Sequence, residues 1–87
     1  MPSLAKKNDS HVTVVKKVWF TEDFICLALS DGREIKTPLE FYPKLKNATE
    51  KQRNQFQIIG LGTGLHWSGL DEDLSVEAIV LGLPSFL

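Results

Sequence analysis

The chain has 87 residues, of which 43% are hydrophobic and 24% are charged, and its formal net charge is −1. This length allows one small domain, residues 1–87, and this composition excludes a long disordered chain. The near-neutral charge excludes a general attraction to nucleic acid or anionic lipid. We expect a cytoplasmic protein, because no apolar stretch is long enough for a signal peptide or a bilayer span.

Charge is distributed unevenly along the chain. The ten Lys and Arg all lie between Lys6 and Arg53, which gives residues 1–53 a net charge of +3, and residues 54–87 have a net charge of −4. Two interpretations follow: the two halves neutralise each other after folding, or an acidic face meets a basic partner. The four acids of the second half are Asp71, Glu72, Asp73 and Glu77.

The first third of the chain predicts a three-strand meander. Residues 1–9 are polar and are expected to be disordered. Strands are predicted at His11–Phe20, Phe24–Ser30 and Arg33–Lys36, and a bulge would reconcile the imperfect alternation of the first. For the second turn we prefer a three-residue loop, 30–32, with Gly32 left-handed, since this gathers the apolar side chains on one face.

Two short helical segments are expected next, at 38–46 and 50–55. Each follows a capping-box pattern, Thr37-Pro-Leu-Glu40 or Thr49-Glu-Lys-Gln52. Pro43 should prevent one continuous helix. A strand is then predicted at Phe56–Ile59.

Residues 65–67 are a candidate continuation of that strand beyond Gly60. The last element is a helix from Ser75, a good N-cap, to Leu81, and Gly82 ends it. The apolar tail, 83–87, either covers the core or joins a partner.

The expected fold class is therefore α+β: a small antiparallel sheet of four to five strands, opening with the N-terminal three-strand meander, with two short helical segments and a C-terminal helix. The predicted core is apolar and drawn from every element: Ile25, Leu27, Leu29, Ile35, Leu45, Ile58, Val76, Ile79 and Val80.

The segment 60–77 is the strongest candidate for a site. Its glycines, Gly60, Gly62 and Gly64, fit neither a phosphate-binding loop nor a dinucleotide fingerprint. They predict a bulged strand or close packing against another backbone or, alternatively, the approach of a ligand. His66 with Asp71 and Asp73 could ligate a metal, but there is no second nearby histidine and no calcium-loop spacing. We therefore predict no metal, no cofactor and no catalytic residue.

Several other residues have a simpler interpretation. The acids before the last helix are expected to stabilise its N-terminus through the helix dipole. Cys26, in an apolar run, is expected to be a core side chain. The basic stretch Lys44–Arg53 is expected to be a solvated face, with phosphate contact as the alternative.

The chain resembles the bacterial family known as domain of unknown function 2442. The features that carry the resemblance are Leu27-Ala-Leu-Ser-Asp-Gly-Arg33, Thr37-Pro-Leu39, Tyr42-Pro-Lys-Leu45, Gly60-x-Gly-x-Gly-Leu-His-Trp67 and Leu70-Asp-Glu-Asp-Leu-Ser-Val76. Ser68 stands where the family often has Pro. The resemblance implies a small α+β domain without assigned catalytic residues, often encoded beside a second small protein in the manner of toxin–antitoxin modules.

These observations predict a non-enzymatic protein–protein interaction module whose partner is the product of an adjacent gene. The predicted interaction residues are His66, Trp67, Asp71, Glu72, Asp73 and Glu77. A homodimer is left open. The alternatives are a dimeric DNA-associated regulator and a metal or small-ligand binder at His66, Asp71 and Asp73.

Overall fold

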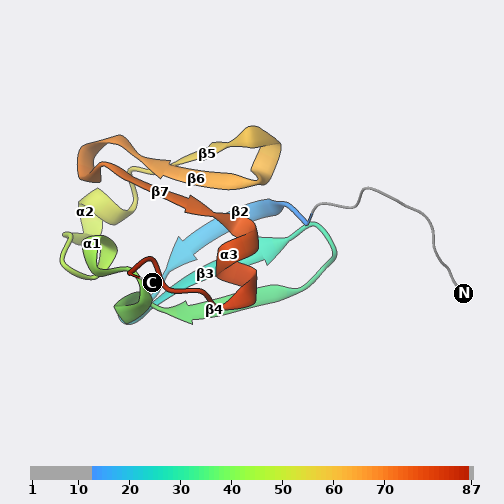
Figure 1. The fold of residues 1–87 in the computed structure, drawn as a ribbon, viewed down its shortest axis with the longest axis horizontal. Coiled ribbons are helices and arrows are strands. Elements are labelled where there is room, and N and C mark those ends of the chain that lie inside the picture. Colours follow the sequence, from blue (N-terminus) through green and yellow to red (C-terminus); the bar gives the residue numbers. More distant parts are fainter. Residues whose placement is uncertain (1–12, 87) are drawn as a thin grey trace, which may run out of the picture.

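The computed structural model describes residues 13–86 and contains two small antiparallel sheets (Figure 1). The first sheet holds β2 (Val15–Phe20), β3 (Phe24–Leu29) and β4 (Glu34–Pro38); the second holds β5 (Gln57–Ile59), β6 (Gly64–Trp67) and β7 (Glu72–Ser75). The helices are α1 (Pro43–Lys46), α2 (Glu50–Arg53) and α3 (Val76–Leu81). The α+β class is confirmed, but the single sheet of four to five strands is wrong. The prediction for residues 1–9 lies outside the described residues.

The β3–β4 hairpin has the predicted three-residue loop. Leu27 pairs with Ile35, and the Leu29 N–H donates to the Arg33 carbonyl at 2.8 Å. Gly32, at φ 93°, occupies the left-handed position that an L side chain rarely adopts. This register places Ile25, Leu27 and Leu29 on the buried face, as the alternation of apolar residues predicted.

The expected bulge lies in β2, between Val15 and Lys17. Val15 pairs with Leu29 and Val18 pairs with Leu27, although the two valines are an odd number of residues apart. The extra residue, Lys16, resets the alternation, and both valines therefore face the core. This bulge explains the imperfect alternation of apolar and polar residues in the first predicted strand.

One of the two predicted helix starts is wrong. Thr37 lies within β4 opposite Ile25 and is buried, so Thr37-Pro-Leu-Glu40 is the end of a strand and not a capping box. A single 3-10 turn, Leu39–Phe41, separates β4 from α1. Pro43 is the first residue of α1. The capping box at Thr49 is confirmed: its hydroxyl accepts from the Gln52 N–H at 3.1 Å, and the Gln52 side chain accepts from the Thr49 N–H at 2.9 Å.

The second sheet departs most from the sequence prediction. The chain reverses in a 3-10 turn at Gly60–Gly62, so residues 64–67 return as β6 and do not continue β5. A further strand, β7, was not predicted, and it leads directly into α3. The Ser75 hydroxyl accepts from the Ala78 N–H at 3.2 Å, and Gly82 ends the helix at φ 75°, as predicted.

One core joins both sheets and α3. Of the predicted core residues, Ile35 and Val80 are only partly buried, and Ile58 is wrong because it is 44% exposed on the edge strand β5. The buried cluster also contains residues outside the predicted core list: Val15, Leu39, Tyr42, Leu65, Trp67 and Leu74. An aromatic chain crosses between the sheets: the Phe56 ring lies 6.3 Å from the Phe20 ring and 6.2 Å from the Trp67 ring, between centroids.

Among residues 13–86, no helix has both the length and the apolar character needed to cross a bilayer.

Candidate functional site

The pairing of β6 with β7 divides the predicted interaction residues between two faces. His66 pairs with Asp73, and the next pair along is Trp67 with Glu72. Successive residues of a strand point to opposite sides, so His66 and Asp73 share the outer face while Trp67 and Glu72 share the inner one. Leu65 and Leu74, which also pair, are buried on the inner face.

Trp67 is a core residue. Its side chain is 0% exposed, and its indole Nε1 donates to the Arg53 carbonyl at 2.8 Å. A fully enclosed ring cannot contact another protein unless the fold opens, so the structure removes Trp67 from the predicted interaction surface. Its place in the family-like motif reflects the packing of β6 against the rest of the core.

His66 and Asp73 form a cross-strand pair on the outer face. Their Nδ1 and Oδ1 atoms lie 2.5 Å apart, and the Asp73 side chain is largely exposed. Within the described part of the chain, no group of three or more His, Cys, Asp and Glu side chains is placed to hold a metal ion. The structure therefore brings together two of the three side chains considered as metal ligands, and an exposed pair of this kind contributes little to stability.

The remaining acids lie in three different settings. Asp71 occupies a left-handed turn at φ 51°, and its carbonyl accepts from the Lys44 Nζ at 2.8 Å. Glu72 lies in β7, where its Oε1 accepts from the Asp73 N–H at 3.2 Å. Only Glu77 lies in the first turn of α3. The expectation that all of these acids support the helix N-terminus is therefore wrong for residues 71–73.

The two charged halves of the chain are not joined by ion pairs in the described structure. The pairs among residues 13–86 are Arg33–Asp31, Lys46–Glu40 and His66–Asp73. None of these joins a Lys or Arg to an acid of the second half. Within this range, the carboxylates of Asp71, Glu72 and Glu77 have no ion-pair partner, although Lys44 contacts the Asp71 carbonyl, so direct ion pairing between the halves does not account for their charge.

The basic stretch makes several contacts within the molecule. Arg53 Nε donates to the Leu45 carbonyl at 2.7 Å, and its Nη2 donates to the Lys46 carbonyl at 3.0 Å. These carbonyls belong to the last turn of α1, where the regular helical hydrogen-bond pattern ends. The Leu45 carbonyl also accepts from the Ala48 N–H at 3.2 Å. Arg53 is thus a helix cap supplied from α2.

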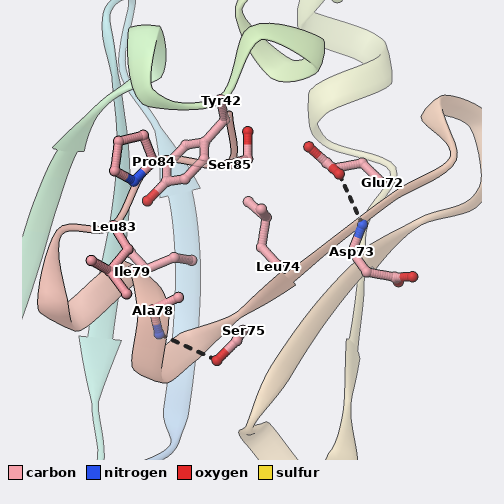
Figure 2. Close-up of a pocket in the computed structure, with 10 residues that line it drawn as sticks. All are labelled: Tyr42, Glu72, Asp73, Leu74, Ser75, Ala78, Ile79, Leu83, Pro84 and Ser85. Atoms are coloured by element: carbon pink, nitrogen blue, oxygen red, sulfur yellow. Dashed lines mark hydrogen bonds between the residues drawn. The ribbon is translucent and has the colours of Figure 1, made fainter. Parts of the chain in front are cut away.

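A groove of about 370 Å³ lies between β7, α3 and the C-terminal tail (Figure 2). Its apolar wall is made by Leu74, Ala78, Ile79, Leu83 and Pro84, and Glu72 and Asp73 lie at its end on β7. The tail is held by the Ser85 N–H, which donates to the Phe41 carbonyl at 3.0 Å. This contact holds the tail at one point, but Leu83 is 48% and Phe86 is 63% exposed, so these two side chains do not cover the core.

Tyr42 also lines the groove and was not predicted as a site residue. Its side chain is 1% exposed, and its hydroxyl completes no hydrogen bond of ordinary geometry. Burial raises the pKa of Tyr42 to about 12, and the nearby Thr37 side chain opposes that shift only in part. Tyr42 is therefore a neutral phenol at physiological pH. The sequence gives no indication that Tyr42 lines a groove, beyond the presence of an aromatic residue before a proline.

The glycine series packs mainly against the protein itself. A Cβ on Gly62 would lie 2.8 Å from the Val14 Cβ and 3.1 Å from the Val15 carbonyl oxygen. Gly64 is likewise covered by the Ile59 side chain. The predicted close approach of backbone therefore holds at Gly62, which fits against the start of β2.

Cys26 is buried, as predicted, but it lies on the face of β3 opposite the core, between Trp19 and Lys36 in the register. Burial raises the pKa of its thiol, while Lys36 acts in the opposite direction. A buried thiol held in its protonated form is a poor nucleophile.

The fold and its site thus define a small α+β domain of two three-stranded sheets, with an exposed His–Asp pair and an acidic β7. Residues 15–85 match the model of the family described as protein of unknown function (DUF2442). The chain belongs to this family.

Two solved structures share the fold. A protein of unknown function from Rhodospirillum rubrum, seen by crystallography, has 26% identity and a TM-score of 0.76, with 86% of this chain and 93% of that chain covered. An uncharacterised protein from Chromobacterium violaceum, solved by NMR, has 24% identity and a TM-score of 0.69, with 83% and 68% covered. No curated protein matches the chain significantly.

Proposed function

We propose that the protein is a non-enzymatic interaction module of the cytoplasm that binds a basic protein through the acidic segment Asp71–Glu77. The observation that supports this is the clustering of four acids within residues 71–77, in a half of the chain without Lys or Arg, whose carboxylates have no Lys or Arg partner within residues 13–86. The three exposed acids are Asp71, Asp73 and Glu77. Charges left unpaired on a surface attract and orient an oppositely charged partner.

The partner we propose is the product of an adjacent gene, as in a two-gene toxin–antitoxin-like system. The resemblance to a family with such gene pairs supports this choice. The interaction residues that remain are His66, Asp71, Glu72, Asp73 and Glu77, with Trp67 omitted because it is enclosed. His66 contributes by holding Asp73 on the outer face.

The test is binding of the purified adjacent-gene product, measured by calorimetry at low and at raised ionic strength. The variant Asp71→Asn/Glu72→Gln/Glu77→Gln should weaken binding by at least about tenfold, and salt should weaken the wild-type complex, since screening acts on exposed charges. Asp73 is left unchanged to preserve its pair with His66.

A matched control is Glu22→Gln/Asp23→Asn/Glu34→Gln. It removes the same number of charges from exposed acids that make no ion pair among the described residues. This control should bind like the wild type. An equal loss in both variants, or no complex between two folded proteins at micromolar concentration, would contradict the proposal.

A further inference from the structure

The outer edge of β5 is unpaired among the described residues. β5 lies at one end of the order β5–β6–β7, and Figure 1 shows it at the upper boundary of the fold. An edge strand presents backbone N–H and C=O groups that can pair with another strand. Proteins usually block such edges with charged side chains, proline or bulges.

The other three edges carry these protections, and β5 does not. β2 has a bulge together with Lys16 and Lys17. β4 carries Glu34, Lys36 and Pro38, and β7 carries Glu72 and Asp73. β5 is Gln57-Ile58-Ile59, and the whole stretch 54–70 contains no Asp, Glu, Lys or Arg.

Apolar side chains gather at this same edge. Ile58 is 44% exposed, Ile59 is 41% exposed, and Leu61 at the tip of the β5–β6 hairpin is 98% exposed. Leu61 also has a left-handed backbone at φ 56°. That conformation is unfavourable for an L residue because Cβ approaches the following carbonyl oxygen. A strained, fully exposed leucine is unfavourable in an isolated molecule, and contact with another protein surface would offset part of that cost.

We infer that β5 pairs with β5 of a second copy of this chain, antiparallel and about a twofold axis at Ile58, to join two three-stranded sheets into one of six strands. A second copy fits this edge because self-pairing of an uncharged strand places no like charges opposite each other. A basic partner finds no acidic side chain on β5. The interface is thereby separate from the acidic segment Asp71–Glu77.

The twofold axis fixes the neighbours across the interface. Ile58 lies opposite Ile58 of the second copy, and Ile59 lies opposite Gln57 of the second copy. Each hairpin tip then reaches the residues that precede β5 in the second copy, so Leu61 approaches Gln55 and Phe56 there. Because each copy contributes only three strand residues, the dimer should be weak and dependent on concentration.

The test compares the mass of the full chain by sedimentation equilibrium across a range of concentrations. Wild-type protein should shift from monomer toward dimer as concentration rises. Ile59→Lys places a charge on the edge and should weaken dimerisation by at least about tenfold. Leu81→Lys is the control, because Leu81 is exposed on α3 and the change likewise replaces an exposed aliphatic side chain with lysine.

Amide hydrogen exchange of wild-type protein provides a second test that needs no variant. Protection of the amides in residues 57–59 should increase with protein concentration. A wild-type chain that stays monomeric to millimolar concentration would overturn the inference. So would equal disruption by Leu81→Lys, or protection of β5 that depends only on an added adjacent-gene product.

Discussion

The Trp67 indole Nε1 donates to the Arg53 carbonyl at 2.8 Å, and the Arg53 guanidinium donates in turn to carbonyls at the end of α1. A single residue therefore links β6, α2 and α1. Trp67 belongs to the segment 60–77 that first suggested a site, and Arg53 ends the basic stretch that was expected to be a solvated face. Their contacts show that they stabilise the corner where the helices meet the second sheet.

Replacing Trp67 with Phe should destabilise the domain strongly. The variant loses the hydrogen bond to Arg53 and leaves a cavity in the core, and together these should lower the free energy of unfolding by about 2 kcal/mol or more. Urea unfolding followed by circular dichroism measures the change. Trp19→Phe, at a partly exposed position, is the control and should cost clearly less. Equal losses would show that the enclosure of Trp67 does not matter.

Replacing Arg53 with Lys should uncap α1. An ammonium cannot reproduce the two donors that Arg53 directs at the Leu45 and Lys46 carbonyls, so we expect a loss of about 1–2 kcal/mol. Arg33→Lys is the matched control, because Arg33 makes only an exposed pair with Asp31. Chemical denaturation of both variants under the same conditions gives the comparison. A larger effect at Arg33 would contradict the assignment.

Replacing Gly62 with Ala should be among the more damaging small substitutions. The new methyl group would lie 2.8 Å from the Val14 Cβ, at a backbone φ of 97°. We expect a loss of about 2 kcal/mol from this contact together with the left-handed conformation. Gly69→Ala should be nearly neutral, because nothing lies within 4 Å of its added Cβ. Thermal melting of the two variants distinguishes these outcomes.

Replacing Tyr42 with Phe should be neutral or should stabilise the protein at neutral pH. It removes a buried hydroxyl that lacks an ordinary hydrogen bond, whose cost is about 1 kcal/mol. A loss of more than about 1 kcal/mol would instead mean that the contact with Thr37 is a full hydrogen bond.

The same residue predicts a loss of stability in alkali. The pKa of Tyr42 is raised from 10.0 to about 12 in the folded protein, so the unfolded chain releases the proton first. Stability from this group is complete below pH 10.0 and is lost as the pH rises toward about 12, by about 3 kcal/mol in total. Tyr42→Phe should lack this component. Tyr42 is the one tyrosine of the chain, so tyrosinate absorbance reports it directly.

The first sheet could be predicted from the sequence because its turn and its largest aliphatic side chains together specify one register. In β3, Ile25, Leu27 and Leu29 specify one buried face, and Asp31-Gly32 supplies the turn. The helix ends at Thr49, Ser75 and Gly82 were also predicted correctly, because capping depends on residues that are close in sequence. The predicted helix start at Thr37 was wrong because the T-x-x-E spacing fits a capping box by chance. The pairing of Thr37, in β4, with Ile25, in β3, decides its conformation.

The second sheet could not be predicted from the sequence, and the reason is physical. β7 contains two acids and only one buried apolar residue, Leu74, so it has neither strand propensity nor a visible alternation. Its pairing with β6 supplies the stability that its own sequence lacks. The separation of His66 from Trp67 onto opposite faces follows from the alternation within β6 alone. The pairing with β7 adds the position of Asp73 opposite His66, which no single segment predicts.

The aromatic contacts from Phe20 through Phe56 to Trp67 couple the unfolding of the two sheets. A three-stranded sheet of this size gains too little from its own side chains to persist alone, and here each sheet supplies part of the other's interior. Melting should therefore be a single cooperative event, with calorimetric and van't Hoff enthalpies in agreement. Cutting the chain between α1 and α2 should leave two fragments that regain order only when they are mixed.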